Sequence, residues 1–161
     1  MSDKKLEPRV IGIFICPVAG ERMQEVLEVE AIAGAGLKGD RYYEGRGTFS
    51  APGAGYELTL VEAEQLEAID LPWEQARRNV VTRGISLNPL VGQRFKIGEV
   101  ECIGRRLCEP CAHLEKLSRP GILRPLVHRA GLRADILVGG TVSVGDEVAI
   151  VNLSTDERPA L

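Results

Sequence analysis

Aromatic side chains, histidines and long apolar runs are all scarce in this 161-residue chain. With only seven aromatic residues, the core is expected to consist of Val, Ile and Leu rather than of rings. No segment approaches the roughly 20 consecutive apolar residues that a membrane helix requires, which excludes a helical membrane span. The net charge is small too: 20 Lys and Arg against 23 Asp and Glu give a formal net charge of −3. This balance gives no reason to expect non-specific binding to nucleic acid or to a membrane.

A convincing export signal is also missing. Lys4 and Lys5 precede an apolar stretch at 10–20, but Glu7, Pro8 and Arg9 stand between them, and no clean cleavage site follows. We therefore expect a cytoplasmic protein whose four cysteines are reduced. At about 150 residues per domain, the chain should form a single domain over 1–161, with a core at about 9–151 and a frayed tail at 152–161.

Many short apolar segments between glycine-rich turns predict a mainly β fold. We expect strands at 9–16, 24–33, 57–60, 80–82, 134–138 and 141–151, a strand–turn–strand over 94–103 around Gly98, and short helices at 61–69, 73–79, 111–117 and 122–129. Thr59 and Glu62 have the spacing of a capping box, which predicts a helix start near Val61. With many strands and few short helices, the pattern favours a closed β-barrel-like domain over a βαβ sheet.

Positive charge is concentrated in one part of the chain. Residues 77–133 contain twelve Lys and Arg but four acids, so this span carries +8 and the remainder −11. Arginine dominates the span, and its planar fork suits phosphate and carboxylate groups. The span is poor in aromatic side chains for stacking bases, which argues against nucleic acid. Two interpretations stay open: a pocket for a small anion, or solvated arginines paired with the acidic remainder.

The stretch Arg105-Arg-Leu-Cys-Glu-Pro-Cys-Ala-His113 has the strongest chemical signal. A thiolate is both the nucleophile and the metal ligand, and nearby arginines favour that anion. Three mechanisms compete: a Cys108–Cys111 dithiol redox pair, a zinc site, and one reactive cysteine that binds a soft metal or carries sulfur as a persulfide. The dithiol lacks a surrounding βαβ pattern, and the zinc site lacks further ligands at suitable spacing.

The remaining thiols and histidines have simpler interpretations. Cys16 and Cys102 fall in predicted strands and are expected to be small core residues. Three interpretations of Cys108 stay open: a core residue, a resolving thiol, or a residue without a particular role. His128 is expected to be a partly buried structural histidine, and His113 need not face the same way as the thiol two residues before it.

An ordered set of motifs resembles the MOSC (molybdenum cofactor sulfurase C-terminal) domain family. The motifs are Gly36-Leu-Lys-Gly-Asp-Arg41, Arg77-Arg-Asn-Val-Val-Thr-Arg-Gly84, Leu90-Val-Gly92 with Ile97-Gly98, Pro110-Cys111, and Val138-Gly-Gly140 with Val144-Gly-Asp146. Each motif alone is weak, but together they follow the family's order over about residues 10–150. The resemblance implies a β-barrel-like MOSC domain and selects Cys111, after Pro110, as the key thiol.

The resemblance also implies a chemistry. Family members are thought to receive sulfur on this cysteine, or to hold the molybdenum of a pterin cofactor through it, and some reduce N-hydroxylated compounds. By motif position, Cys111 is the expected metal ligand and catalytic thiol. Asp40 is the candidate for orienting a group or accepting a proton, with a buried salt bridge to Arg41 as the alternative. Lys38, Arg41, Arg78 and Asn79 are the expected cofactor-binding residues.

Two departures from the family pattern limit these expectations. Tyr42 and Tyr43 follow the Gly-Asp-Arg motif where many relatives have histidine, which puts imidazole chemistry there in doubt. The chain also lacks the pyridoxal-phosphate desulfurase domain of the sulfurases, so no pyridoxal-phosphate site is expected. A sulfur carrier would need a separate cysteine desulfurase, and a reductase would need an electron-donor protein. The alternatives are a non-catalytic anion- or partner-binding module with a structural Cys111, and the dithiol redox protein.

Overall fold

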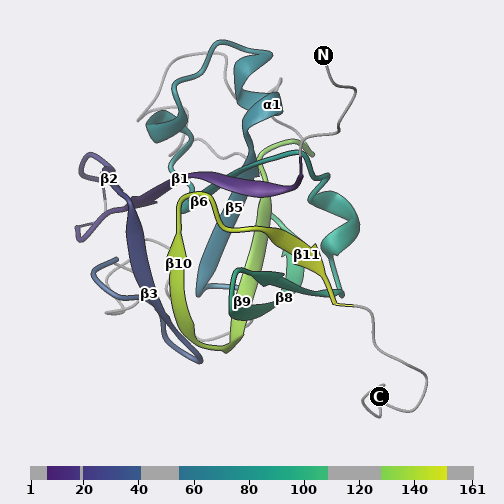
Figure 1. Cartoon of the computed structure of the whole chain (residues 1–161). Helices are drawn as coiled ribbons and strands as arrows, with labels where there is room; N and C mark the ends of the chain where they lie inside the picture. The colour runs from purple at the N-terminus through teal and green to yellow at the C-terminus, as the bar shows by residue number, and fades with distance from the viewer. Residues whose placement is uncertain (1–6, 19, 41–54, 109–127, 152–161) are drawn as a thin grey trace.

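The computed structural model describes residues 7–18, 20–40, 55–108 and 128–151. Eleven strands and three short helices lie in these ranges (Figure 1). The strands are β1 (Arg9–Ile15), β2 (Gln24–Val26), β3 (Glu28–Ile32), β4 (Gly36–Leu37), β5 (Leu58–Glu62), β6 (Val80–Arg83), β7 (Arg94–Ile97), β8 (Val100–Leu107), β9 (Leu132–Val138), β10 (Gly140–Ser143) and β11 (Val148–Ile150). The helices are α1 (Ala63–Glu67) and the 3-10 turns η1 (Trp73–Ala76) and η2 (Asn88–Leu90).

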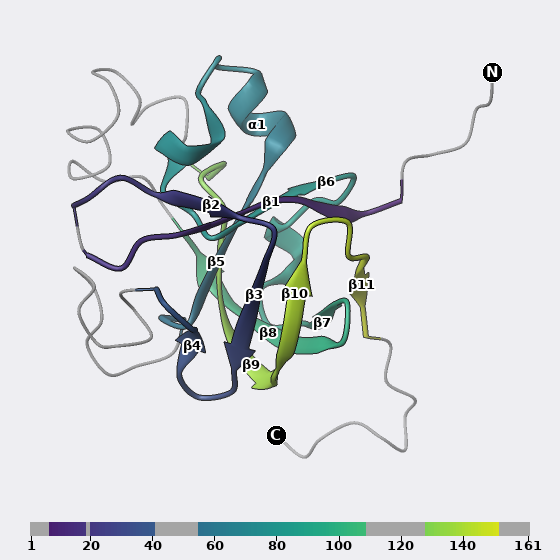
Figure 2. The same ribbon diagram turned by 60° about the vertical axis from the view of Figure 1, so that its left-hand side comes forward.

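Eight of these strands form one sheet in the order β11-β7-β8-β9-β5-β6-β1-β2, and β10-β3-β4 form a second, smaller sheet. Neighbours in the large sheet are antiparallel except β5 and β6, which are parallel and are joined through α1 and η1. A parallel pair needs a crossover of this kind, because a tight turn only joins antiparallel strands. In Figure 2 the small sheet, with β3 and β10, stands in front of the large one.

Both faces of the central strands are covered, which explains why their sequences are apolar almost without interruption. Along each of these strands, alternate side chains point to opposite faces of the sheet and pack into two different hydrophobic clusters. Leu60 and Val80 pack between the two sheets with Val29 and Val142 of the small sheet. On the opposite face, neighbouring strand residues pack against α1 and η1, through Leu66 among others. The two layers of core therefore lie on either side of β1, β5 and β6.

The mainly β prediction is confirmed, but the sheet is not closed into a barrel. β11 and β2 are its two ends, and an isolated bridge between Arg9 and Glu147 joins β1 to the residues before β11 without extending into a ladder. The difference lies in how the strands pair: among the described residues, β2 pairs with β1 alone and β11 with β7 alone, so the two end strands of the sheet do not pair with each other. The parallel strand–helix–strand arrangement that the sequence pattern disfavoured occurs once, as β5-α1-η1-β6.

The local predictions differ from the structure at identifiable residues. The strand expected over 24–33 is interrupted at Leu27, which separates β2 from β3. The capping box is wrong, because Thr59 lies inside β5 and α1 begins after Glu62 without a side-chain cap. The strand–turn–strand around Gly98 is confirmed as β7 and β8. The helices expected at 111–117 and over most of 122–129 lie outside the described residues. Within the described ranges, no helix has the length and apolar character needed to cross a membrane.

Candidate functional site

Asp40 lies three residues beyond the end of β4, at the end of the Gly36–Asp40 segment. Gly39 has a φ of +93°, a left-handed conformation that glycine adopts without strain. The Asp40 side chain is 1% exposed, and its Oδ1 accepts a hydrogen bond from the backbone N–H of Cys16 at 2.8 Å. A buried carboxylate requires such donors, because burial otherwise disfavours its charge. Asp40 is thus fixed against the end of β1. Arg41, its predicted partner, lies outside the described residues.

Cys16 and Arg77 form a contact beside Asp40 that the sequence interpretation missed. Cys16 is fully buried, as predicted, but its Sγ also lies 3.8 Å from Nη2 of Arg77. Arg77 donates a hydrogen bond through Nη1 to the carbonyl of Glu21 at 2.7 Å. The same carbonyl accepts the Cys16 thiol at 3.3 Å. Residues 16 and 77 are far apart in sequence, so no spacing rule indicated this contact.

Two surface hollows open next to this contact. One, of about 250 Å³, is lined by Arg77, Glu74 and Gln75 together with residues 20–23. The other, of about 430 Å³, is lined by residues 17, 18 and 21–24. Both lie around the turn between β1 and β2. Arg77 therefore both contacts the buried Cys16 thiol and lines one of these hollows.

Arg78 bridges the two ends of the segment that contains Cys111. Its side chain is buried, with Nε donating to the carbonyl of Ala130 at 2.8 Å and Nη2 donating to the carbonyl of Cys108 at 3.4 Å. The Cys108 N–H also donates to the Gly131 carbonyl at 2.8 Å. Cys111 itself lies outside the described residues. Arg78 thus holds residues 108 and 130 side by side through these two hydrogen bonds.

Asn79 uses its side chain to join three strands of the large sheet. Its Oδ1 accepts from both the backbone N–H and the hydroxyl of Thr59, each at 3.1 Å. Its Nδ2 donates to the carbonyl of Phe14 at 3.1 Å. The backbone N–H of Asn79 returns a bond to the Thr59 hydroxyl at 2.9 Å. These contacts link β1 and β5 at the start of β6, and they position the two arginines before it.

Lys38 differs from the other described candidates in being exposed. Its ammonium lies 3.9 Å from a carboxylate oxygen of Glu30, and its side chain is 66% exposed. An ion pair at this distance and exposure contributes little to stability. The Lys38 ammonium can therefore turn towards another anion at small cost.

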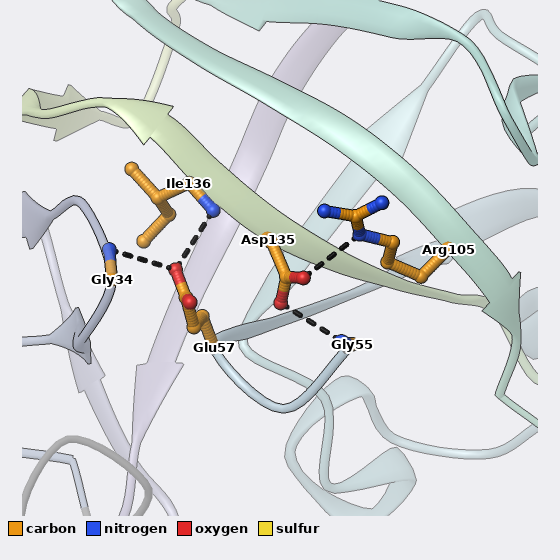
Figure 3. Close-up of polar contacts among 6 residues, drawn as sticks. All are labelled: Gly34, Gly55, Glu57, Arg105, Asp135 and Ile136. Atoms are coloured by element: carbon orange, nitrogen blue, oxygen red, sulfur yellow. Dashed lines mark hydrogen bonds and ion pairs between the residues drawn. The ribbon is translucent and has the colours of Figure 1, made fainter. Parts of the chain in front are cut away.

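Glu57 ties the turn between β3 and β4 to the large sheet (Figure 3). One carboxylate oxygen accepts from the N–H of Gly34 at 3.2 Å, in the turn between β3 and β4, and from the N–H of Ile136 in β9 at 2.9 Å. Burial raises the pKa of Glu57, and the Ile136 N–H opposes that effect. This residue had no sequence signal, because its partners are remote in sequence.

The other thiols and the second histidine are not grouped for metal binding. Cys102 is fully buried in β8, as predicted, and burial raises the pKa of its thiol to about 12. Cys108 is 1% exposed at the end of β8, which favours a core role. His128 was expected to be partly buried and is instead exposed, with its carbonyl accepting from Nδ2 of Asn88. In the described ranges, no three His, Cys, Asp or Glu residues are close enough to share a metal ion.

Comparison with known proteins identifies both a family and a fold. A family model described as the MOSC domain matches residues 57–149, more than half of the chain. The YUAD protein from Bacillus subtilis has a similar structure, with a TM-score of 0.76 at 16% identity, over 91% of this chain and 97% of that one. YiiM from Escherichia coli gives a TM-score of 0.61 at 19% identity, over 94% and 73%. YiiM from Geobacillus stearothermophilus gives 0.61 at 12%, over 90% and 75%.

At these identities the structural similarity establishes the fold alone. A search of curated proteins gives no match.

Proposed function

The chain belongs to the MOSC domain family, and on this basis we propose that it binds molybdenum cofactor or carries sulfur on Cys111. The family is associated in general with molybdenum cofactor and sulfurase-related functions. The proposal for this chain adds the residues: Cys111 as the reactive thiol, with Lys38, Arg41 and Asp40 around it. The reduction of N-hydroxylated compounds, with electrons from a partner protein, is the proposed activity of the cofactor-bound form.

The observation that carries this proposal is the pair of hydrogen bonds made by Arg78. They hold the carbonyls of Cys108 and Ala130 together, at the two ends of the segment that contains Pro110 and Cys111. A buried arginine bonded to two carbonyl oxygens resists displacement, because breaking either bond leaves a buried charge less well satisfied. Reactive side chains need such rigid support to keep a productive geometry. Arg78 is therefore proposed as a positioning residue for the thiol.

The residues available fit the chemistry of the cofactor. A thiolate is a soft ligand suited to molybdenum, and the pterin phosphate requires cations. Lys38 is exposed and weakly paired, so its ammonium is available to a phosphate, and Arg41 is proposed to assist it. Asp40 is buried and its Oδ1 accepts a backbone N–H, which fixes the carboxylate in place; it is proposed to orient a group or to accept a proton. When bound, the cofactor would supply a redox-active metal.

Asn79 fits better as part of the framework than as a cofactor ligand. Both polar ends of its side chain are already bonded, to Thr59 and to Phe14. Asn79 can therefore contact a cofactor through its side chain only if it breaks its hydrogen bonds to Thr59 or Phe14. We therefore propose that Asn79 acts through Arg78, by fixing where β6 starts.

In the sulfur-carrying form, Cys111 receives a sulfur atom from a separate desulfurase. The Cys111 thiolate attacks the outer sulfur of the donor's persulfide and forms a new S–S bond. The S–S bond of the donor breaks at the same time, and the donor leaves as a thiolate. No oxidant or reductant is consumed, because the sulfur changes partners without a net change in electrons.

The test is chemical analysis of protein produced in a host that makes the cofactor. We expect either molybdenum with pterin, or the added mass of one sulfur on Cys111, and expect Cys111→Ser to lose both. Cys108→Ser is the matched control and should retain the loading. Absence of molybdenum, pterin and added sulfur from the unsubstituted protein would refute the proposal. Equal loss in the two variants, together with a reversible disulfide between the two thiols, would favour the dithiol redox alternative.

A further inference from the structure

The turn between β1 and β2 and the 3-10 turn η1 together line the hollow of about 250 Å³ described above. Four of its lining residues are charged, two of each sign: Glu21, Arg22, Glu74 and Arg77. Glu21 and Arg22 are exposed, whereas Glu74 and Arg77 are half-buried. Among the described residues, none of these four side chains has an opposite charge within ion-pair distance. The hollow therefore has equal numbers of positive and negative groups that are not paired with one another.

Arg77 is held beside this hollow by groups that do not neutralise its charge. Its Nη1 donates to the carbonyl of Glu21 at 2.7 Å, and its Nη2 lies 3.8 Å from the sulfur of Cys16. The Cys16 thiol itself donates to the carbonyls of Val18 and Glu21. A guanidinium has five N–H donors, so donors remain for a ligand after these two contacts. A half-buried guanidinium without a carboxylate partner favours an anionic ligand group.

Glu74 belongs to the same short turn as Arg77. The backbone N–H of Arg77 donates to the Glu74 carbonyl at 3.3 Å at the end of η1, and Arg77 has a left-handed φ of +58°. This φ is strained for a residue other than glycine, and strain of this kind is concentrated at ligand and active sites. One element thus contributes both a carboxylate and a guanidinium to the lining of one hollow.

The second hollow, of about 430 Å³, adjoins the first and adds apolar residues. The two hollows share Glu21, Arg22 and Met23 as lining residues. Pro17 and Val18 line only the second one, and Val18 is 52% exposed. An apolar ligand group that covers Val18 removes apolar surface from water, which favours binding. A charged lining therefore lies next to an apolar one.

We propose that the two hollows together bind a free α-amino acid with an apolar side chain. The carboxylate of the ligand pairs with Arg77, its ammonium pairs with Glu74, and its side chain covers Val18. A zwitterion matches one positive and one negative group without adding a net charge. A hollow of about 250 Å³ is smaller than the roughly 300–1,000 Å³ pockets of drug-sized ligands, which suits the head group of an amino acid. The proposal does not depend on the chemistry of Cys111.

The first test is calorimetric titration of the full chain with L-leucine and with two analogues that each lack one charge. N-acetyl-L-leucine has no ammonium, and L-leucinamide has no carboxylate. We expect saturable binding of L-leucine, with an affinity about ten- to a hundredfold higher than for either analogue, because each analogue loses one charged contact. Equal affinity for L-leucine and either analogue would overturn the proposal. So would the absence of saturable binding with L-leucine at about 10 mM.

A substitution then assigns the ammonium of the ligand to Glu74. Glu74→Gln should weaken the binding of L-leucine about ten- to a hundredfold but leave that of N-acetyl-L-leucine unchanged, since this analogue has no ammonium. Glu25→Gln is the matched control, because Glu25 is exposed on β2 and lines neither hollow. Equal losses for the two ligands, or an equal effect of Glu25→Gln, would contradict the proposal.

The corresponding substitution at Arg77 tests the carboxylate. Arg77→Gln should weaken L-leucine about ten- to a hundredfold and leave L-leucinamide unchanged. Because Arg77 also bonds to the Glu21 carbonyl, folding of this variant is checked by its Tm without ligand, and Glu74→Gln decides the question if it does not fold. L-leucine should raise the Tm of the unsubstituted protein and of Glu25→Gln, but much less that of Glu74→Gln. An equal rise in all three proteins would count against the proposed site.

Discussion

Replacing Asn79 by alanine should destabilise the protein strongly, whether or not any cofactor is bound. The Asn79 side chain is 2% exposed and makes three hydrogen bonds, two with Thr59 and one with the Phe14 carbonyl. Alanine leaves three buried polar groups without their partner. Each such group costs about 1–3 kcal/mol, so even at the lower end the loss is about 3 kcal/mol. That is a large part of the roughly 5–15 kcal/mol that stabilises a typical domain.

Urea denaturation of the cofactor-free protein measures this loss directly. We expect the unfolding midpoint of Asn79→Ala to fall while the slope stays close to that of the unsubstituted protein, as for a change in stability alone. Asn88→Ala is the control, because Asn88 is exposed and makes one side-chain bond, to the His128 carbonyl. Its effect should stay below about 1 kcal/mol.

The outcome also separates a structural Asn79 from a cofactor-binding one. Our reasoning would be refuted if Asn79→Ala lost less than about 1 kcal/mol of unfolding free energy. If such a stable variant had also lost pterin and molybdenum, Asn79 would have to contact the cofactor, as the family resemblance implies. A strongly destabilised variant that still loads cofactor when folded would place its role in the sheet.

Three further predictions follow from single side chains. Asp40→Asn keeps an acceptor for the Cys16 N–H, so the variant should still fold while cofactor or sulfur loading on Cys111 falls; an unchanged loading of the folded variant would exclude a role for the Asp40 charge. Gly131→Ala should cost more than about 3 kcal/mol, seen as a lower Tm, because a Cβ there would overlap the Leu60 carbonyl at a φ of +115°. Glu57 has a raised pKa in the folded state, so its stabilising effect is greatest below the unfolded pKa and is lost as pH rises through the folded one. The unfolding free energy should therefore fall relative to that of Glu57→Gln as pH rises above about 4.5, the ordinary pKa of a glutamate, and parallel pH curves would contradict this.

Sequence patterns predicted strands and turns best where the residues of a single strand or turn are enough to indicate it. β1 has a continuous apolar run, and Gly98 sits between two alternating segments, so both were found. Thr59 and Glu62 misled because a capping-box spacing also occurs by chance in a strand. The Thr59 hydroxyl is instead bonded to Asn79, a residue 20 positions away. Whether the sheet closes depends on how strands that are distant in sequence pair, and local sequence patterns do not indicate such pairing.

For the candidate site as well, the sequence indicated individual residues but not the partners that they contact. Asp40 and Arg78 were selected by motifs, yet their partners, the Cys16 N–H and the carbonyls of Cys108 and Ala130, are 24 to 52 residues away. The excess of arginine in 77–133 was visible in the sequence. That Arg106 and Arg133 share a face was not, because it depends on a bulge in β8 and on its register with β9.

The order of strands in the large sheet has a consequence for folding kinetics. β7 and β8 form a hairpin, but β1 with β6, β5 with β9 and β11 with β7 are joined across long stretches of chain. Pairings of this kind require loop closure before they contribute stability, so folding should take milliseconds to seconds rather than microseconds. β11 is made after the other strands of the sheet, and it covers the edge of β7 near Phe95 and Ile97. During synthesis that edge stays open to a neighbouring chain until β11 is available, which makes it the place where early aggregation would begin.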